Sequence, residues 1–154
     1  MQFANYFFAS IISFLGLVMG FMLVKIAPEE QKPLIKYFNF AKIFFLLLVF
    51  IILLFYYSYS SIYILGLIAC CVFLLYIEHK MSDLQKKSMI VYAVFGFLYF
   101  LSSKNTSLFV LESSLILLYG IFASSMLEMK PKIYEKFLAK NAVFVLIASA
   151  LFLL

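Results

Sequence analysis

Long apolar runs alternate with short polar segments over the whole chain. The apolar runs cover about residues 3–26, 37–57, 62–78, 88–102, 108–127 and 138–154. A helix of roughly 20 predominantly apolar residues matches the hydrocarbon thickness of a bilayer. The pattern therefore predicts an all-α, polytopic membrane helical bundle of about six transmembrane helices, with residues 1–154 forming a single transmembrane domain.

The fourth and sixth apolar runs are shorter than the others, so these helices must borrow flanking residues or the bilayer must thin around them. Before the sixth run, Ile133, Tyr134 and Phe137 fall on one helical face, and lysines fall on the other. We expect an interfacial amphipathic segment that leads into the last span. The alternative is five full spans followed by a C-terminal interfacial helix that does not cross.

The lysines between the apolar runs indicate how the chain is threaded. Segments 27–36, 79–87 and 128–140, with their edges, carry most of the lysines, whereas 58–61 has none and 103–107 has one. Cytoplasmic loops of membrane proteins carry an excess of basic residues. We therefore expect an integral protein of the cell membrane, with the three lysine-rich loops in the cytoplasm and both termini outside.

Composition narrows the possible classes of protein further. The chain is 67% hydrophobic and only 12% charged, about half the charged fraction of ordinary soluble domains. Its net charge is +5, but the basic residues are lysines in short loops between apolar runs. Such lysines report membrane topology, so we expect the lipid bilayer as the surroundings and no nucleic acid as a partner.

Glu112 is the carboxylate that the apolar pattern does not explain, because it lies inside the run 108–127. An ionised carboxylate at that depth costs several kcal/mol unless it is paired or hydrated. We therefore expect it to face the bundle interior. Three roles stay open: a structural hydrogen bond to a neighbouring serine or tyrosine, an ion, proton or substrate site, and pairing with a partner subunit. Ser113, beside it, is expected to bond back to its own helix.

Lys42 is the other ionisable residue well inside an apolar run. Its predicted depth differs from that of Glu112 by roughly 15 Å along the helix axis, which argues against a direct ion pair between them. A lysine in the inner half of a span can extend its amine to the interface. We expect Lys42 to do so.

Small residues mark the expected contacts between helices, because close backbone approach drives helix association in lipid. The candidate packing positions are Gly16 and Gly20, which form a GxxxG pattern, together with Gly66 and Gly120. We expect them to lie in seams within the bundle.

Familiar catalytic motifs are missing from the sequence. It contains no GxSG, HExxH or glycine-rich phosphate loop, and its only histidine, His79, cannot build a multi-histidine metal site. His79 follows Glu78, which is a weak acid–base signal and more typical of an interfacial residue. We expect no catalytic, cofactor or metal site, although an enzyme of unfamiliar type stays open.

Two short stretches, "IAPEEQKPLIKYF" at 26–38 and "SLILLYGIFASS" at 114–125, resemble small uncharacterised archaeal multipass membrane proteins that carry a PEE-x-KP loop after the first helix. Leu34 stands where that pattern has glycine. The resemblance implies a small multipass helical fold and brings no activity with it.

Three functions are compatible with these observations. The first is a structural or accessory subunit of a larger membrane complex, with other membrane subunits or copies of itself as partners, which fits the short loops and the few polar groups within the spans. The second is a small solute or ion transporter module that uses Glu112. The third is a lipid-binding or lipid-modifying protein with the Glu78–His79 pair as its base.

Overall fold

A computed structural model describes residues 2–127 and 131–154 of the chain, and these residues form seven α-helices. The helices are α1 (Phe3–Ile26), α2 (Pro28–Tyr56), α3 (Ser61–Lys80), α4 (Leu84–Ser102), α5 (Thr106–Ser125), α6 (Pro131–Asn141) and α7 (Val143–Leu153). No strand occurs within the described ranges. The predicted all-α bundle is thus confirmed.

Short polar connections end one helix and begin the next. Asp83 caps α4 by accepting hydrogen bonds from the backbone amides of Gln85 and Lys86. Asn105 caps α5 in the same way, through the amides of Ser107 and Leu108. Such caps satisfy amides that have no partner inside the helix, so each connection needs only a few residues.

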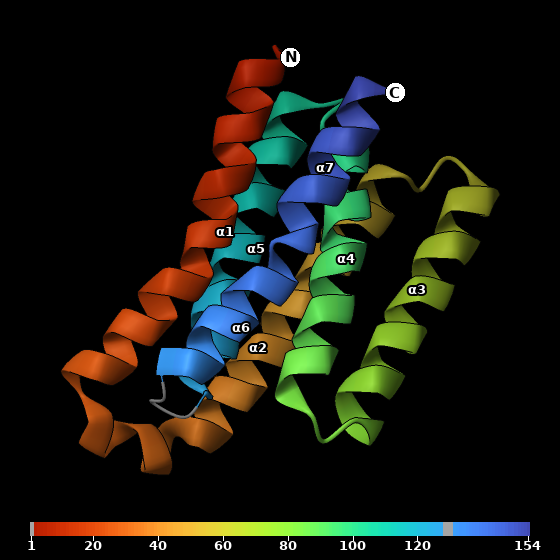
Figure 1. Cartoon of the computed structure of the whole chain (residues 1–154). Coiled ribbons are helices and arrows are strands. Elements are labelled where there is room, and N and C mark those ends of the chain that lie inside the picture. The colour runs from red at the N-terminus through yellow and green to blue at the C-terminus, as the bar shows by residue number, and fades with distance from the viewer. Residues whose placement is uncertain (1, 128–130) are drawn as a thin grey trace.

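The helices run back and forth along one direction, so the connections gather at two ends of the bundle (Figure 1). The α1–α2 and α3–α4 connections lie at one end, which we call the lysine end because Lys25, Lys32, Lys80 and Lys86 lie there or next to it. Both termini and the α2–α3 and α4–α5 connections lie at the other, which we call the terminal end.

Five segments are long and apolar enough to cross a membrane: α1, α2, α3, α5 and the stretch Lys132–Leu153, which joins α6 to α7. The chain is therefore a multipass membrane protein by the length and composition of its helices. α4 is not among the five because its first turn holds Gln85, Lys86 and Lys87, yet it passes through the bundle and buries much of its surface.

The last pass combines the two features expected of it. The first half, α6, has a polar lysine-bearing face, whereas α7 is almost wholly apolar. α7 packs against α4 and α1, and the chain ends beside its own N-terminus (Figure 1). The stretch Lys132–Leu153 is long and apolar enough to cross a membrane, as the six-helix prediction expects. Residues 128–130 of the predicted loop 128–140 lie outside the described residues, and the remainder is helical.

α5 is the central helix. It packs against α1 on one side and α2 on another, and it also contacts α4. α3 is the most peripheral helix, with most of its contacts to α2 and few to α4, and Figure 1 shows it standing at the edge of the bundle. Groups that α5 turns inward are therefore the best enclosed in the molecule.

Candidate functional site

A group of charged side chains is buried near the lysine end. The Lys42 amine lies 2.7 Å from Glu78 Oε2, and the Lys87 amine lies 2.9 Å from the same oxygen. Lys87 also donates to the Glu78 backbone carbonyl at 2.7 Å, and the Tyr119 hydroxyl donates to Glu78 Oε1 at 3.2 Å. We call these four residues the Lys–Glu cluster.

Four helices supply the cluster, one residue each. Lys42 comes from α2, Glu78 from the last turn of α3, Lys87 from the first turn of α4 and Tyr119 from α5. Asp83 caps α4 at the end of the short α3–α4 connection. The chain reverses there, so Lys87 contacts Glu78, which precedes it by nine residues. The cluster therefore ties the peripheral helix α3 to the rest of the bundle.

The cluster is closed to solvent and unbalanced in charge. The side chains of Lys42 and Glu78 are each 3% exposed, and that of Lys87 is 9% exposed. Two ammonium groups share a single carboxylate, so the cluster carries one positive charge in excess when all three groups are ionised. A buried charge without a counter-charge is costly in a low-dielectric interior.

Glu112 forms a second buried site, closer to the terminal end. The residue is 1% exposed, and neither carboxyl oxygen has a hydrogen-bond partner among the described residues. The hydroxyls of Tyr57 and Tyr99 have other neighbours. Tyr57 donates to the Leu101 carbonyl at 2.8 Å, and the Tyr99 hydroxyl lies 3.4 Å from that of Ser113.

Of the three roles left open for Glu112, a hydrogen bond to a neighbouring serine or tyrosine is not found among the described residues. Ser113 donates to the Phe109 carbonyl at 2.6 Å, and Ser114 donates to the Val110 carbonyl at 2.9 Å. Both serines thus bond within α5, as helical serines commonly do. Their hydroxyls are satisfied there, which leaves the carboxyl group of Glu112 without them.

The expectation that Lys42 extends its amine to the interface was wrong. The residue is 2% exposed because Glu78 provides a counter-charge inside the bundle. Lys42 and Glu112 do not meet, in line with their predicted difference in depth. Glu78 is held by two lysines and a tyrosine, so it is not a free base beside His79, as the lipid-modifying hypothesis required.

The sequence reasoning missed the cluster because Glu78 and Lys87 lie at the ends of apolar runs. Charged residues at such positions usually belong to loops, and Lys87 is the last residue of the lysine-rich segment 79–87. The helical spacing of Lys87 with apolar residues of α4 is the one sequence signal that could have indicated its burial. Lys87, Val91, Phe95, Leu98 and Ser102 recur at helical spacing and are all buried, so Lys87 lies on the inward face of α4.

Three of the four candidate packing glycines lie where α1 and α5 approach most closely. A Cβ atom at Gly16 or Gly20 would collide with the backbone carbonyl oxygen of Leu117 or Ile121, and one at Gly120 would approach the backbone of Gly16. Gly66 on α3 has nothing within 4 Å of the same position, so its assignment to a packing seam was wrong. The reason is that α3 stands apart from its neighbours on that side.

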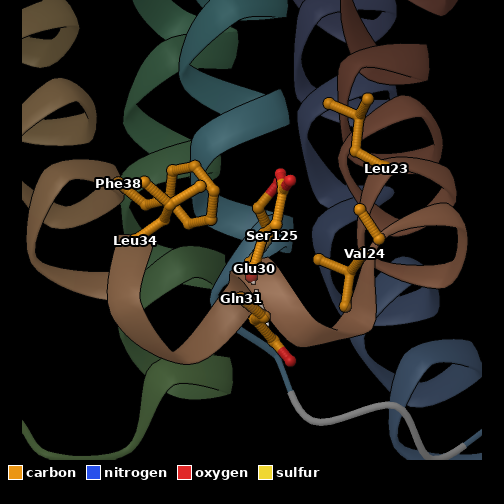
Figure 2. A pocket seen from close by; sticks show the side chains of 8 residues that line it. Leu23, Val24, Glu30, Gln31, Leu34, Phe38 and Ser125 are labelled. Carbon is orange, nitrogen blue, oxygen red and sulfur yellow. Dashed lines mark hydrogen bonds between the residues drawn. The ribbon is translucent and has the colours of Figure 1, made fainter.

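The bundle also contains a small cavity at the α1–α2 turn, away from both buried sites (Figure 2). It holds about 150 Å³, and Leu23 and Val24 of α1 face Leu34 and Phe38 of α2 across it. Gln31 beside it donates to the Ser125 and Leu127 carbonyls, at 3.0 and 2.7 Å. These bonds satisfy carbonyls at the end of α5, which is a structural role.

The two buried sites share one face of α5. Glu112 and Tyr119 are seven residues apart, which is two helical turns and a rise of about 10.5 Å. Leu115 and Ile116, both buried, lie between them. No group of three or more histidine, cysteine or acidic residues is placed to hold a metal ion in the part of the chain that the structure describes.

Together, the helices and the buried charges define a multipass helical membrane protein. Comparisons with family models, curated proteins and solved structures found no match for the chain.

Proposed function

We propose that the protein moves a proton or a small cation across the membrane and that Glu112 is the residue that carries it. The observation behind this proposal is the burial of Glu112, whose carboxyl oxygens accept no hydrogen bond from any described residue. Because no described side chain or backbone amide occupies its oxygens, the carboxyl group can bind a mobile positive ion.

The energetics support a functional reading of Glu112. A buried polar group without a partner costs about 1–3 kcal/mol, and more when it is charged. An apolar residue at the same place would avoid this cost and would suit the run 108–127. Ionisable groups inside membrane spans commonly mark ion pathways and proton relays.

The Lys–Glu cluster supports the same proposal. The accessory-subunit hypothesis rested partly on the scarcity of polar groups within the spans. Lys42, Glu78 and Lys87 are all buried in the bundle, however, and with Glu112 they place ionisable groups near both ends. Ionisable groups near both ends are compatible with an ion pathway through the bundle.

An accessory role in a membrane complex is the second candidate, and the position of α3 favours it. Leu65, Val72 and Phe73 of this helix are 74, 60 and 53% exposed, and α3 makes few contacts with α4. A helix of another membrane subunit, or of a second copy, would pack there. Such a protein would tolerate the loss of the Glu112 carboxylate.

The test is ion flux through the purified chain in liposomes. Vesicles that contain a pH-sensitive dye or a sodium indicator would be given an ion gradient, with valinomycin and potassium to set the potential. We expect flux of at least one ion, and Glu112→Gln should reduce it at least tenfold. Glu135→Gln is the matched control, because Glu135 is exposed on α6.

Mild-detergent purification with mass spectrometry separates the two candidates. Absence of flux in the wild-type chain, together with a stoichiometric set of other membrane proteins in the preparation, would replace ion transport by the accessory role. Flux from the chain alone that Glu112→Gln leaves unchanged would remove Glu112 as the carrier.

A further inference from the structure

The Lys–Glu cluster restricts which ion can pass, given the proposed transport function. The buried face of α5 leads from Glu112 to Tyr119, and Tyr119 donates to Glu78 within the cluster. On the proposed route along this face of α5, an ion that reaches Tyr119 would meet Lys42 and Lys87 beside Glu78. A sodium or potassium ion there would lie beside two ammonium groups that share one carboxylate, and like charges repel strongly in a low-dielectric interior.

A proton can pass such a cluster, because an amine can accept or release one. Loss of one proton from either lysine takes the cluster from one excess positive charge to neutrality. The same step removes the cost of burying an uncompensated ammonium group. The cluster is therefore suited to exchange protons and unsuited to hold a metal cation.

The contacts of the two lysines differ, and the difference identifies the one that exchanges. Lys87 has two acceptors, Glu78 Oε2 and the Glu78 carbonyl, which both stabilise its charged form. Lys42 has one acceptor, Glu78 Oε2, and is the less exposed of the two. A lysine amine carries three donors when protonated, so Lys42 leaves more of them unsatisfied.

We propose that the transported ion is a proton and that Lys42 is the second proton-exchanging residue, near the lysine end, with Glu112 as the first. This proposal rests on the transport function proposed above. The charged or titratable groups that face Lys42 are Glu78 from α3 and Lys87 from α4, with Tyr119 of α5 behind Glu78. The side chains that α1 buries include no charged group.

The exchange step is simple in its chemistry. One N–H bond of the Lys42 ammonium breaks, its electron pair stays on Nζ, and the proton moves to Glu78 Oε2, 2.7 Å away, and then to the aqueous phase at the lysine end. Leu115 and Ile116 separate this site from Glu112, so transfer between the two requires water to enter or α5 to move.

Arginine substitution tests the assignment, because a guanidinium keeps the positive charge and does not release its proton in proteins. Lys42→Arg and Lys86→Arg form a matched pair: each retains its positive charge, and only the first removes the proposed exchanging amine, because Lys86 is exposed on α4 and lies outside the cluster. Lys42→Met is a second variant that cannot carry a proton and leaves a neutral Glu78–Lys87 pair. Each variant would be checked for wild-type elution and melting temperature before it enters liposomes.

We expect proton flux without sodium or potassium flux in the wild type. Lys42→Arg and Lys42→Met should each reduce proton flux at least tenfold, whereas Lys86→Arg should stay within twofold of wild type. Sodium or potassium flux that depends on Glu112 would overturn the proton assignment and leave the transport function standing. Proton flux that is lost in Glu112→Gln and unchanged in both Lys42 variants would overturn the role of Lys42. No flux of any ion would overturn the transport function and this inference with it.

Discussion

At the residue scale, the two buried carboxylates of the described bundle differ in what surrounds them. Glu78 is contacted by two amines and a hydroxyl, whereas Glu112 has no hydrogen-bonding neighbour. The first residue is thus tied into the structure by its partners. The burial of the second costs free energy that no hydrogen bond from a described residue offsets. Replacing Glu112 therefore tests stability and function separately.

Glu112→Leu should stabilise the fold and abolish its activity. Leucine removes a buried polar group without a partner, so we expect a gain of about 1–3 kcal/mol in the free energy of unfolding. The measurement is thermal unfolding in detergent, combined with the flux assay. Glu135→Leu, at an exposed position, should change stability by no more than about 0.5 kcal/mol. A lower melting temperature for Glu112→Leu would show that the carboxyl group has a stabilising partner.

Glu78→Gln should be the most damaging single change in the Lys–Glu cluster. It leaves two buried ammonium groups without a carboxylate, and loss of one partner from a buried pair typically costs about 3–5 kcal/mol. Lys42→Met instead leaves one amine opposite one carboxylate, so its cost should be smaller. The melting temperatures of the two variants in the same detergent measure this difference. Equal melting temperatures would contradict an excess positive charge in the cluster.

At the scale of elements, the α1–α5 contact and the position of α3 are opposite cases of helix association. α1 and α5 meet through glycines that allow backbone to approach backbone, which is the form of packing that lipid does not oppose. α3 has a glycine as well, but no neighbour close to it. A small residue therefore permits a seam and does not by itself create one.

Gly16→Ala should destabilise the fold, whereas Gly66→Ala should stabilise it. At Gly16 the added methyl group meets the Leu117 carbonyl oxygen, so the helices must separate, at a cost of about 1–3 kcal/mol. At Gly66 the methyl group enters open space, and alanine is favoured over glycine in a helix by about 0.5–1 kcal/mol. Thermal unfolding of the two variants measures this, and destabilisation by Gly66→Ala would indicate a partner helix on α3.

At the scale of the whole molecule, the bundle has two chemically different ends. Both termini lie at one end, and most of the lysines lie at the other (Figure 1). Basic residues are retained on the cytoplasmic side of membranes. We therefore propose that the lysine end faces the cytoplasm and that Glu112 lies closer to the outer face.

Cysteine labelling of intact cells tests this orientation. In a background with Cys70 and Cys71 replaced by alanine, Tyr59→Cys should react with a membrane-impermeant maleimide from outside, because Tyr59 is 99% exposed at the terminal end. Ser82→Cys, in the α3–α4 connection, should react only after the cells are permeabilised. The reverse labelling pattern would show the opposite orientation, with the Lys–Glu cluster at the outer face.

The sequence by itself determined the all-α membrane bundle, because hydrophobic runs of spanning length can satisfy their backbone groups only as helices. It placed α1 and α3 closely, but α2 begins at Pro28, inside the segment 27–36 that was expected to be a loop. It also singled out Glu112, since a carboxylate inside an apolar run is visible without a structure. Gly16, Gly20 and Gly120 could be proposed from their spacing alone.

Only the tertiary structure decided which groups meet. Glu78 and Lys87 look like loop charges in the sequence, and Lys42 looks like a lysine that reaches the interface, yet they share one buried site because four helices converge there. Glu112 looks like a hydrogen-bonded residue, yet the nearby serines bond within their own helix. Partners across helices depend on how the helices rotate and approach one another, and hydropathy along the chain carries no information about that rotation.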